Sequence, residues 1–228
     1  MEQFWNIITE LAEGFGNTLL LFAVTLVFAF PLGLILAFGS MSKFKPLKWL
    51  VKTLIWVIRG TPLMLQILLV SFIPQYVFKT PTKELAAALG LTINATMFVF
   101  VALAFVINYA CYFSEIYRAG IEAIPVGQYE AGQVLGLTKN QIFSKIVFMQ
   151  VVRRILPPMS NEIITLVKDT SLAQILGVVD LLNAAKHAVN HYVILTPFVY
   201  ATVFYLVFNG LLTVLLGKME KKLSYYKV

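Results

Sequence analysis

A long uncharged and apolar run, Thr18–Ser40, constrains the fold of this chain more than any other feature. At about 1.5 Å per residue a helix over this run would reach roughly 34 Å, enough to cross a hydrocarbon core of about 30 Å. Pro31 and Gly33 lie inside the run, and a kink there is tolerable when neighbouring helices satisfy the freed backbone groups. We therefore expect a membrane span over residues 18–40.

Four further apolar stretches follow, and we expect a span over each of residues 54–78, 92–113, 161–182 and 193–217. Hydrophobic residues make up 59% of the chain and charged residues 13%, which is more apolar surface than a soluble domain of 228 residues could cover. The sequence thus predicts an all-α membrane protein with five transmembrane helices in a single domain, residues 1–228.

Two of these spans carry features that an ordinary span lacks. Before 54–78, the amphipathic piece Pro46–Ile58 is expected along the membrane interface, and Thr61 with Pro62 suits the start of a helix. The stretch 161–182 contains or borders Glu162, Lys168, Asp169 and Asp180. Ionisable groups at membrane depth are costly, so these should face a partner, an aqueous cavity or a substrate path.

The distribution of Lys and Arg predicts the orientation. With the N-terminus outside and the C-terminus in the cytoplasm, only Lys79, Lys83 and Lys186 lie on the outer side, and Lys168 lies within a span. The other basic residues fall on the cytoplasmic side: Lys43, Lys45, Lys48, Lys52, Arg59, Arg118, Lys139, Lys145, Arg153, Arg154, Lys218, Lys221, Lys222 and Lys227. This bias follows the positive-inside rule.

Several function classes are disfavoured by what the chain contains. The net charge is +7, but the basic residues lie in the gaps between apolar runs. This distribution is typical of a membrane protein and not of a nucleic-acid-binding surface. Cys111 is the sole cysteine, and His187 with His191 shows no third metal ligand. The only stretch resembling a phosphate loop, 210–219, has Met219 where magnesium would need Ser or Thr. We expect no cofactor on this chain and no enzyme activity.

The longest polar segment runs from Glu115 to about Ser160, and its part 117–150 should form a cytoplasmic loop. It contains a candidate surface helix, Tyr129–Leu137, with Gly136 as its stop. An acidic residue at its first turn suits the helix dipole, and small residues allow another protein to approach closely. Glu130, Ala131, Gly132 and Gly136 are therefore candidate docking residues, although an ordinary solvated loop would show the same spacing.

Four motifs in this order resemble the permeases of the polar amino acid uptake family of ABC importers, which carry histidine, arginine, glutamine, cystine and similar solutes. They are RGTPL (59–63) with Gln66, SEIYRAGI (114–121), IPVGQYEA (124–131) and LVKDTSL (166–172). Within them, Glu130-Ala131-Gly132 followed by Gly136 looks like the EAA loop that docks on the ATPase. Two positions depart from the pattern: Gly132 replaces Ala, and Phe148-Met149 replaces the usual Leu-Pro.

The resemblance implies an ABC type I importer permease fold in a bacterial inner membrane. It also implies a second permease, identical or not, a dimer of ATPase subunits that hold ATP and Mg²⁺, and an extracytoplasmic binding protein that delivers the amino acid. The resemblance does not name the amino acid.

For substrate binding we single out Lys168, Asp169, Ser171 and Gln174, which could match both the carboxylate and the ammonium of a free amino acid. Structural ion pairing is the equal alternative for Lys168 and Asp169. Asn108, the one strongly polar side chain of 92–113, is expected to bond a neighbouring helix. A self-contained ion-coupled carrier or channel is the alternative function, and an intramembrane enzyme ranks third.

Overall fold

A computed structural model of the chain describes residues 1–223, and these form helices and connecting loops without a β-strand. The helices are α1 (Glu2–Ser40), α2 (Lys45–Arg59), α3 (Leu63–Tyr76), α4 (Thr82–Ala88), α5 (Ile93–Glu122), α6 (Val126–Val134), α7 (Lys139–Ile142), α8 (Phe148–Asp169), α9 (Leu181–Tyr192) and α10 (Thr196–Leu223). A π-helical turn, Phe143–Val147, joins α7 to α8, and a 3₁₀-helix, Thr170–Leu176, follows α8.

Three of the described helices, α1, α5 and α10, are long and apolar enough to cross a membrane. Helices α2 and α3 meet the same requirement only when they are taken together, and they are bent by 110° at the break between them. The predicted span 54–78 is therefore not one helix. Pro62 has no N–H to continue the hydrogen-bond ladder of α2, and the chain turns there.

The predicted span 161–182 is also divided. Helix α8 ends at Asp169, the 3₁₀-helix ends at Gly177 in the left-handed conformation (φ +72°), and α9 begins at Leu181. The Asp180 carboxylate accepts hydrogen bonds from the backbone N–H groups of Leu182 and Asn183, which caps the new helix. Asp180 therefore has a local structural role.

Helices α1 and α5 pack closely because one stripe of α1 carries small residues. Ala29, Gly33 and Ala37 recur every four residues and are buried. A Cβ atom on Gly33 would lie 2.9 Å from the Cβ atom of Phe113 on α5, too close for a side chain there. The small residues thus set the distance between the two longest helices.

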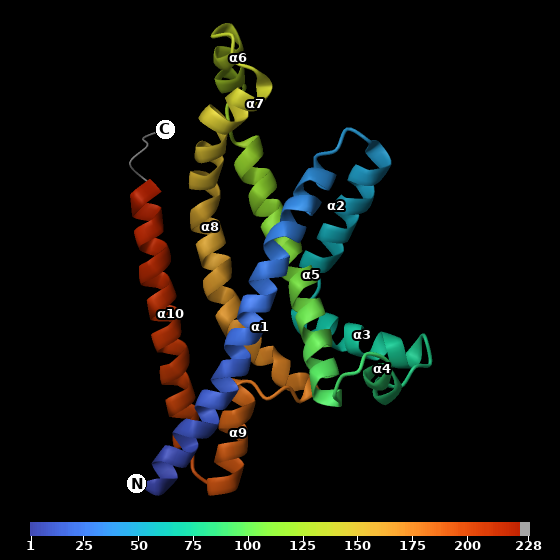
Figure 1. Ribbon diagram of the computed structural model, residues 1–228, viewed down its shortest axis with the longest axis vertical. Helices are drawn as coiled ribbons and strands as arrows, with labels where there is room; N and C mark the ends of the chain where they lie inside the picture. Colours follow the sequence, from blue (N-terminus) through green and yellow to red (C-terminus); the bar gives the residue numbers. More distant parts are fainter. Residues whose placement is uncertain (224–228) are drawn as a thin grey trace.

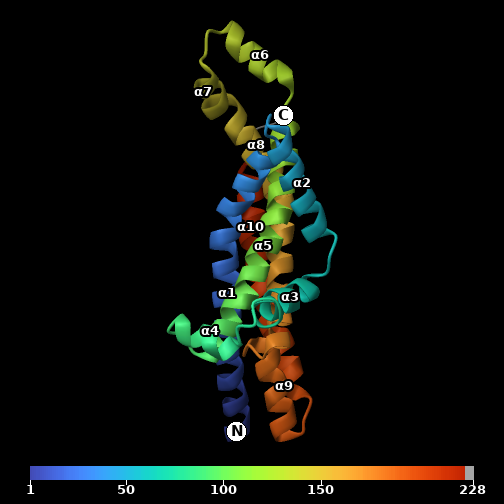
Figure 2. The ribbon, with the colours of Figure 1, turned by 90° about the vertical axis from the view of Figure 1, so that its right-hand side faces the viewer.

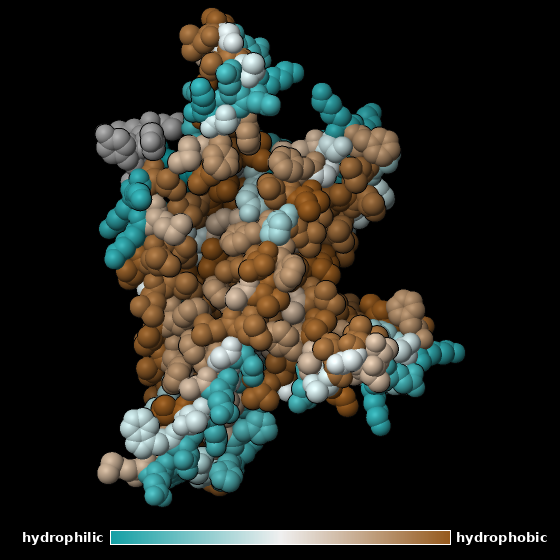
Figure 3. All heavy atoms as spheres, viewed as in Figure 1, coloured by the Kyte–Doolittle hydropathy of each residue, from teal (hydrophilic) through white to brown (hydrophobic). Residues whose placement is uncertain are grey.

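The two ends of the molecule differ in composition from its middle. Helices α1, α5, α8 and α10 run alongside one another, with the N-terminus and α9 at one end and α6 and α7 at the other (Figures 1 and 2). Helices α3 and α4 project to one side. Hydrophobic residues cover the middle of the visible face, and hydrophilic residues gather at its ends (Figure 3).

Candidate functional site

The first predicted site, the polar segment 117–150, extends past the bundle. Helices α6 and α7 form its tip (Figure 1), and Arg154 on α8 holds its base by donating a 2.7 Å hydrogen bond to the Ala123 carbonyl oxygen. Glu130 and Ala131 are exposed on α6. Beside them Val134 and Leu135 are 87% and 76% exposed, a large apolar surface for such a short helix.

Gly132 faces the segment's own interior. It is buried, and a Cβ atom built on it would lie 2.6 Å from Cγ1 of Ile142. Ile142 is only 1% exposed and packs with Ile124, Val147 and Val151 in a small separate core. The glycine therefore leaves room for Ile142, so the Gly that replaces the family's Ala matches a need within this chain.

Gly136 has open space around it, but its backbone has a φ of +72°. The Gly136 N–H donates to the Gln133 carbonyl oxygen at 2.9 Å, and the Leu137 N–H donates to the Gly132 carbonyl oxygen at 3.0 Å. This is the glycine stop of α6 that the sequence predicted. The requirement at position 136 is thus conformational.

The second departure from the family pattern also has a structural counterpart. Without the Leu-Pro breaker, the chain stays helical from Lys139 through the π-helical turn into α8, which begins at Phe148. Phe143 and Phe148 are each about half exposed, with ring centroids 6.1 Å apart.

The predicted substrate residues do not form one cluster. Lys168 is exposed and, with Ser171, lines a cavity of about 360 Å³ that also borders Tyr205 and Asn209 of α10. Asp169 points to the other side, where its Oδ2 accepts a 2.7 Å hydrogen bond from the hydroxyl group of Tyr109 on α5. Adjacent helix residues point about 100° apart, and this separates the two charges.

The other two predicted residues differ in their hydrogen bonding. The Ser171 hydroxyl group donates to the Lys168 carbonyl oxygen at 2.8 Å, a local helix bond. The side-chain oxygen of Gln174 is buried and has no hydrogen-bond partner within residues 1–223.

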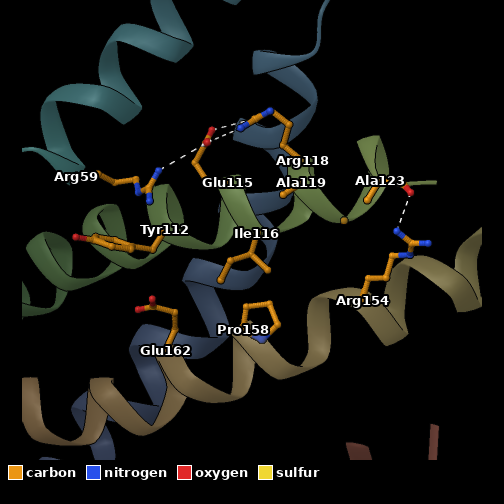
Figure 4. A pocket seen from close by; sticks show the side chains of 11 residues that line it. Arg59, Tyr112, Glu115, Ile116, Arg118, Ala119, Ala123, Arg154, Pro158 and Glu162 are labelled. Carbon is orange, nitrogen blue, oxygen red and sulfur yellow. Dashed lines mark hydrogen bonds and ion pairs between the residues drawn. The ribbon is translucent and has the colours of Figure 1, made fainter. Parts of the chain in front are cut away.

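A larger cavity, about 510 Å³, lies between α2, α5 and α8 on the side nearer α6 (Figure 4). It is lined by Arg59, Tyr112, Glu115, Ile116, Arg118, Ala119, Gly120, Ala123, Arg154, Pro158 and Glu162. Arg118 joins Glu115 at 2.7 Å and Glu122 at 2.6 Å along α5. The sequence shows that Arg118 lies three residues after Glu115 and four before Glu122. It does not show that Arg59 and Glu162 line the same cavity, because that depends on how the helices pack.

A buried amide pair fixes the position of the cavity wall formed by α2. The side-chain nitrogen of Gln66 donates to the Ile58 carbonyl oxygen at 2.7 Å and lies 2.9 Å from the Thr61 hydroxyl oxygen. The Gln66 side-chain oxygen accepts from Asn108 at 2.9 Å. This confirms the predicted interhelical role of Asn108 and ties the α2–α3 break to α5.

Comparison with known proteins gives a consistent match. Residues 29–225 match the family model described as binding-protein-dependent transport system inner membrane component. The chain is 34% identical over 227 residues to the L-cystine transport system permease protein TcyB of Bacillus subtilis (strain 168), covering 99% of this chain and 90% of that protein. It is also 34% identical over 214 residues to the arginine transport system permease protein ArtQ of the same organism, covering 93% and 91%.

Solved structures agree in fold. The chain superposes with a TM-score of 0.80 on the crystal structure of an amino acid ABC transporter with histidines, at 28% identity and 96% coverage of both chains. An inward-facing structure of the MetNI methionine ABC transporter shares the fold, with a TM-score of 0.64 at 15% identity.

Proposed function

Because the chain belongs to the family of binding-protein-dependent transport system inner membrane components, we propose that it forms the translocation path of an ATP-driven importer for a polar amino acid. Its relatives are permeases for cystine and arginine, and the solved transporter that it resembles carries an amino acid. The chain is a membrane permease subunit and not an enzyme, so a separate subunit binds ATP with Mg²⁺ and hydrolyses it.

The proposed topology has five spans with the N-terminus outside and the C-terminus in the cytoplasm. Helices α1, α5 and α10 form three of them, the bent pair α2–α3 forms another, and α8 with the following 3₁₀-helix forms the fifth. The position of α6 at the opposite end of the molecule from the N-terminus supports this orientation (Figure 1).

The observation that carries the function is the exposed apolar tip at α6. Val134 and Leu135 lie past the cytoplasmic end of α5, on the cytoplasmic side of the proposed membrane, so lipid does not cover them. A partner protein with an apolar groove would bury them, with Glu130 and Ala131 at the rim of the contact. We assign this surface to the ATPase subunit.

In this mechanism, ATP closes a pair of ATPase subunits, and the two α6 helices of a permease dimer move with them. The spans then switch from an inward-facing to an outward-facing packing, and hydrolysis resets them. An extracytoplasmic binding protein delivers the amino acid to the outward-facing state. The second permease is a copy of this chain or a similar one.

Within the path, Asp169 with Tyr109 forms one polar position, and Lys168 with Ser171 forms another. The amino acid's charged groups would meet these positions in turn rather than together, because the two face different sides of α8. Gln174, with its unbonded side-chain oxygen, is a third contact.

Reconstitution tests this function. The permease, its ATPase subunit and its binding protein are placed in liposomes, and uptake of radiolabelled L-cystine, L-arginine and L-glutamine is measured with ATP on the ATPase side. We expect ATP-dependent uptake of at least one of them. Uptake by the permease alone would instead identify a self-contained carrier or channel.

A further inference from the structure

The three arginine residues that line the 510 Å³ cavity differ in how many of their donors are in use. Arg118 donates three hydrogen bonds: Nε and one terminal nitrogen to Glu115 at 3.2 and 2.7 Å, and the other terminal nitrogen to Glu122 at 2.6 Å. Arg154 donates to the Ala123 carbonyl oxygen at 2.7 Å. These two guanidinium groups are held by the protein itself.

Arg59 is different. A terminal nitrogen of its guanidinium group lies 3.7 Å from the nearer carboxylate oxygen of Glu115, an ion pair that is too long for a hydrogen bond. Its side chain is 41% exposed, and within residues 1–223 its guanidinium donors make no hydrogen bond. The group lies over the ring of Tyr112, 5.1 Å from the ring centroid, which holds it at the cavity (Figure 4).

Moving Arg59 away from Glu115 would leave that carboxylate paired. Arg118 already binds both of its oxygens in the bidentate arrangement that Arg and carboxylate groups favour. The protein can therefore release Arg59 to another carboxylate without leaving a partly buried charge alone, whereas releasing Arg118 would break three hydrogen bonds.

The opposite wall of the cavity offers the complementary charge. Glu162 points into the cavity from α8 (Figure 4), and within residues 1–223 it has no hydrogen bond or ion pair. A volume of about 510 Å³ falls within the range of about 300–1,000 Å³ typical of small-molecule sites. The cavity thus presents one available cation and one available anion to a zwitterion of small-molecule size.

We propose that this cavity is an amino acid site on the cytoplasmic half of the path, in which Arg59 binds the α-carboxylate group of the solute. The inference rests on the proposed function, and it adds a requirement: the site recognises the free carboxylate that all α-amino acids share, whatever the side chain. Tyr112 positions the guanidinium group, and the loose contact with Glu115 holds Arg59 while the site is empty.

The test compares an amino acid with its α-carboxamide, which keeps the side chain and the ammonium group but lacks the negative charge. Binding of both probes is measured on the purified permease–ATPase complex without the binding protein, so that the selectivity of that protein does not contribute. The probe is whichever of L-cystine, L-arginine and L-glutamine the liposomes take up. Wild type should prefer the free acid.

Arg59→Gln should weaken binding of the free acid by about 10- to 100-fold, the equivalent of one charge-assisted contact, and leave the carboxamide unchanged. Arg59→Lys should keep part of the preference. Lys45→Gln is the matched control, because it removes the same charge at the far end of α2, about 21 Å along the helix. It should bind both probes as wild type does.

Glu115→Gln separates binding from structural pairing. If Arg59 binds the solute, Glu115→Gln should keep the preference for the free acid over the carboxamide. Loss of that preference in both Glu115→Gln and Arg59→Gln would overturn the proposal. An unchanged preference in Arg59→Gln would overturn it as well, even where wild-type uptake is intact. Lack of any ATP-dependent uptake by wild type would instead refute the proposed function.

Discussion

Replacing Gly132 with Ala would restore the residue that the EAA pattern has at this position, yet the structure predicts damage. The added Cβ atom would lie 2.6 Å from Cγ1 and 3.0 Å from Cδ1 of Ile142. Cγ1 sits next to the branch point of a side chain that is 1% exposed, so it has little freedom to move. Either Ile142 or α6 must shift.

Two opposing effects set the magnitude. Overpacking a core costs about 1–3 kcal/mol, and Ala stabilises a helix by about 1 kcal/mol relative to Gly. The net effect is a loss of about 1 kcal/mol of local stability, which increases the open population of the segment about fivefold. In an Ile142→Ala background the three nearest atoms are gone, so Gly132→Ala should stabilise the segment there by a similar amount.

Amide hydrogen exchange over residues 126–147 of the permease in detergent measures this directly. We expect about fivefold faster exchange for Gly132→Ala in the Ile142 background and slower exchange in the Ile142→Ala background, with each variant compared with its own parent. An effect of the same sign in both backgrounds would refute the packing argument, and it would point to an outward role for position 132.

Three other changes test separate parts of the structure. Gly136→Val should reduce both ATPase association, measured by pull-down, and uptake into liposomes, because a bulky residue in the left-handed conformation costs about 1–2 kcal/mol. Gly136→Asn should retain most of both. Asp169→Asn and Tyr109→Phe should each impair substrate-stimulated ATP hydrolysis with assembly intact on size-exclusion chromatography; loss of assembly would favour a structural role for the pair. Gln66→Leu should destabilise the detergent-solubilised protein by about 1–3 kcal/mol, and adding Asn108→Leu should cost less than the sum of the single changes, since the pair leaves fewer unbonded groups; strictly additive thermal shifts would contradict this coupling.

Local rules account for the features that the sequence predicted well. The stop at Gly136 follows from a backbone preference, and Pro62 marks the turn before α3 even though residues 54–78 were expected as one span. The end of α1 at Ser40 was also predicted, whereas the helix begins at Glu2 and not at Thr18, where the uncharged run starts. These features need no information about distant residues.

Local rules could not predict which polar side chains hydrogen-bond to one another. Tyr109 and Asp169 are 60 residues apart in sequence, and Gln66 and Asn108 are 42 apart, so only the packing of α3, α5 and α8 brings them together. The stretch 161–182 was expected as one span because its apolar content hid two local signals, the left-handed glycine at 177 and the helix cap at Asp180. Periodicity alone does not show where a helix ends inside an apolar run.

The buried position of Gly132 changes how the docking segment should be understood. Small residues in such a motif suggest close approach of a partner, but here the small residue at 132 faces Ile142 and the one at 136 satisfies a backbone angle. Gly132 is buried and is therefore not itself a contact surface, whereas Gly136 is exposed, and its contact with the ATPase subunit stays a prediction. The surface that we propose for the ATPase subunit comprises Glu130 and Ala131 with the exposed side chains of Val134 and Leu135. The glycines therefore shape and hold the helix, while the apolar residues beside them provide the area that a partner would bury, and substitutions at the two kinds of position should fail for different reasons.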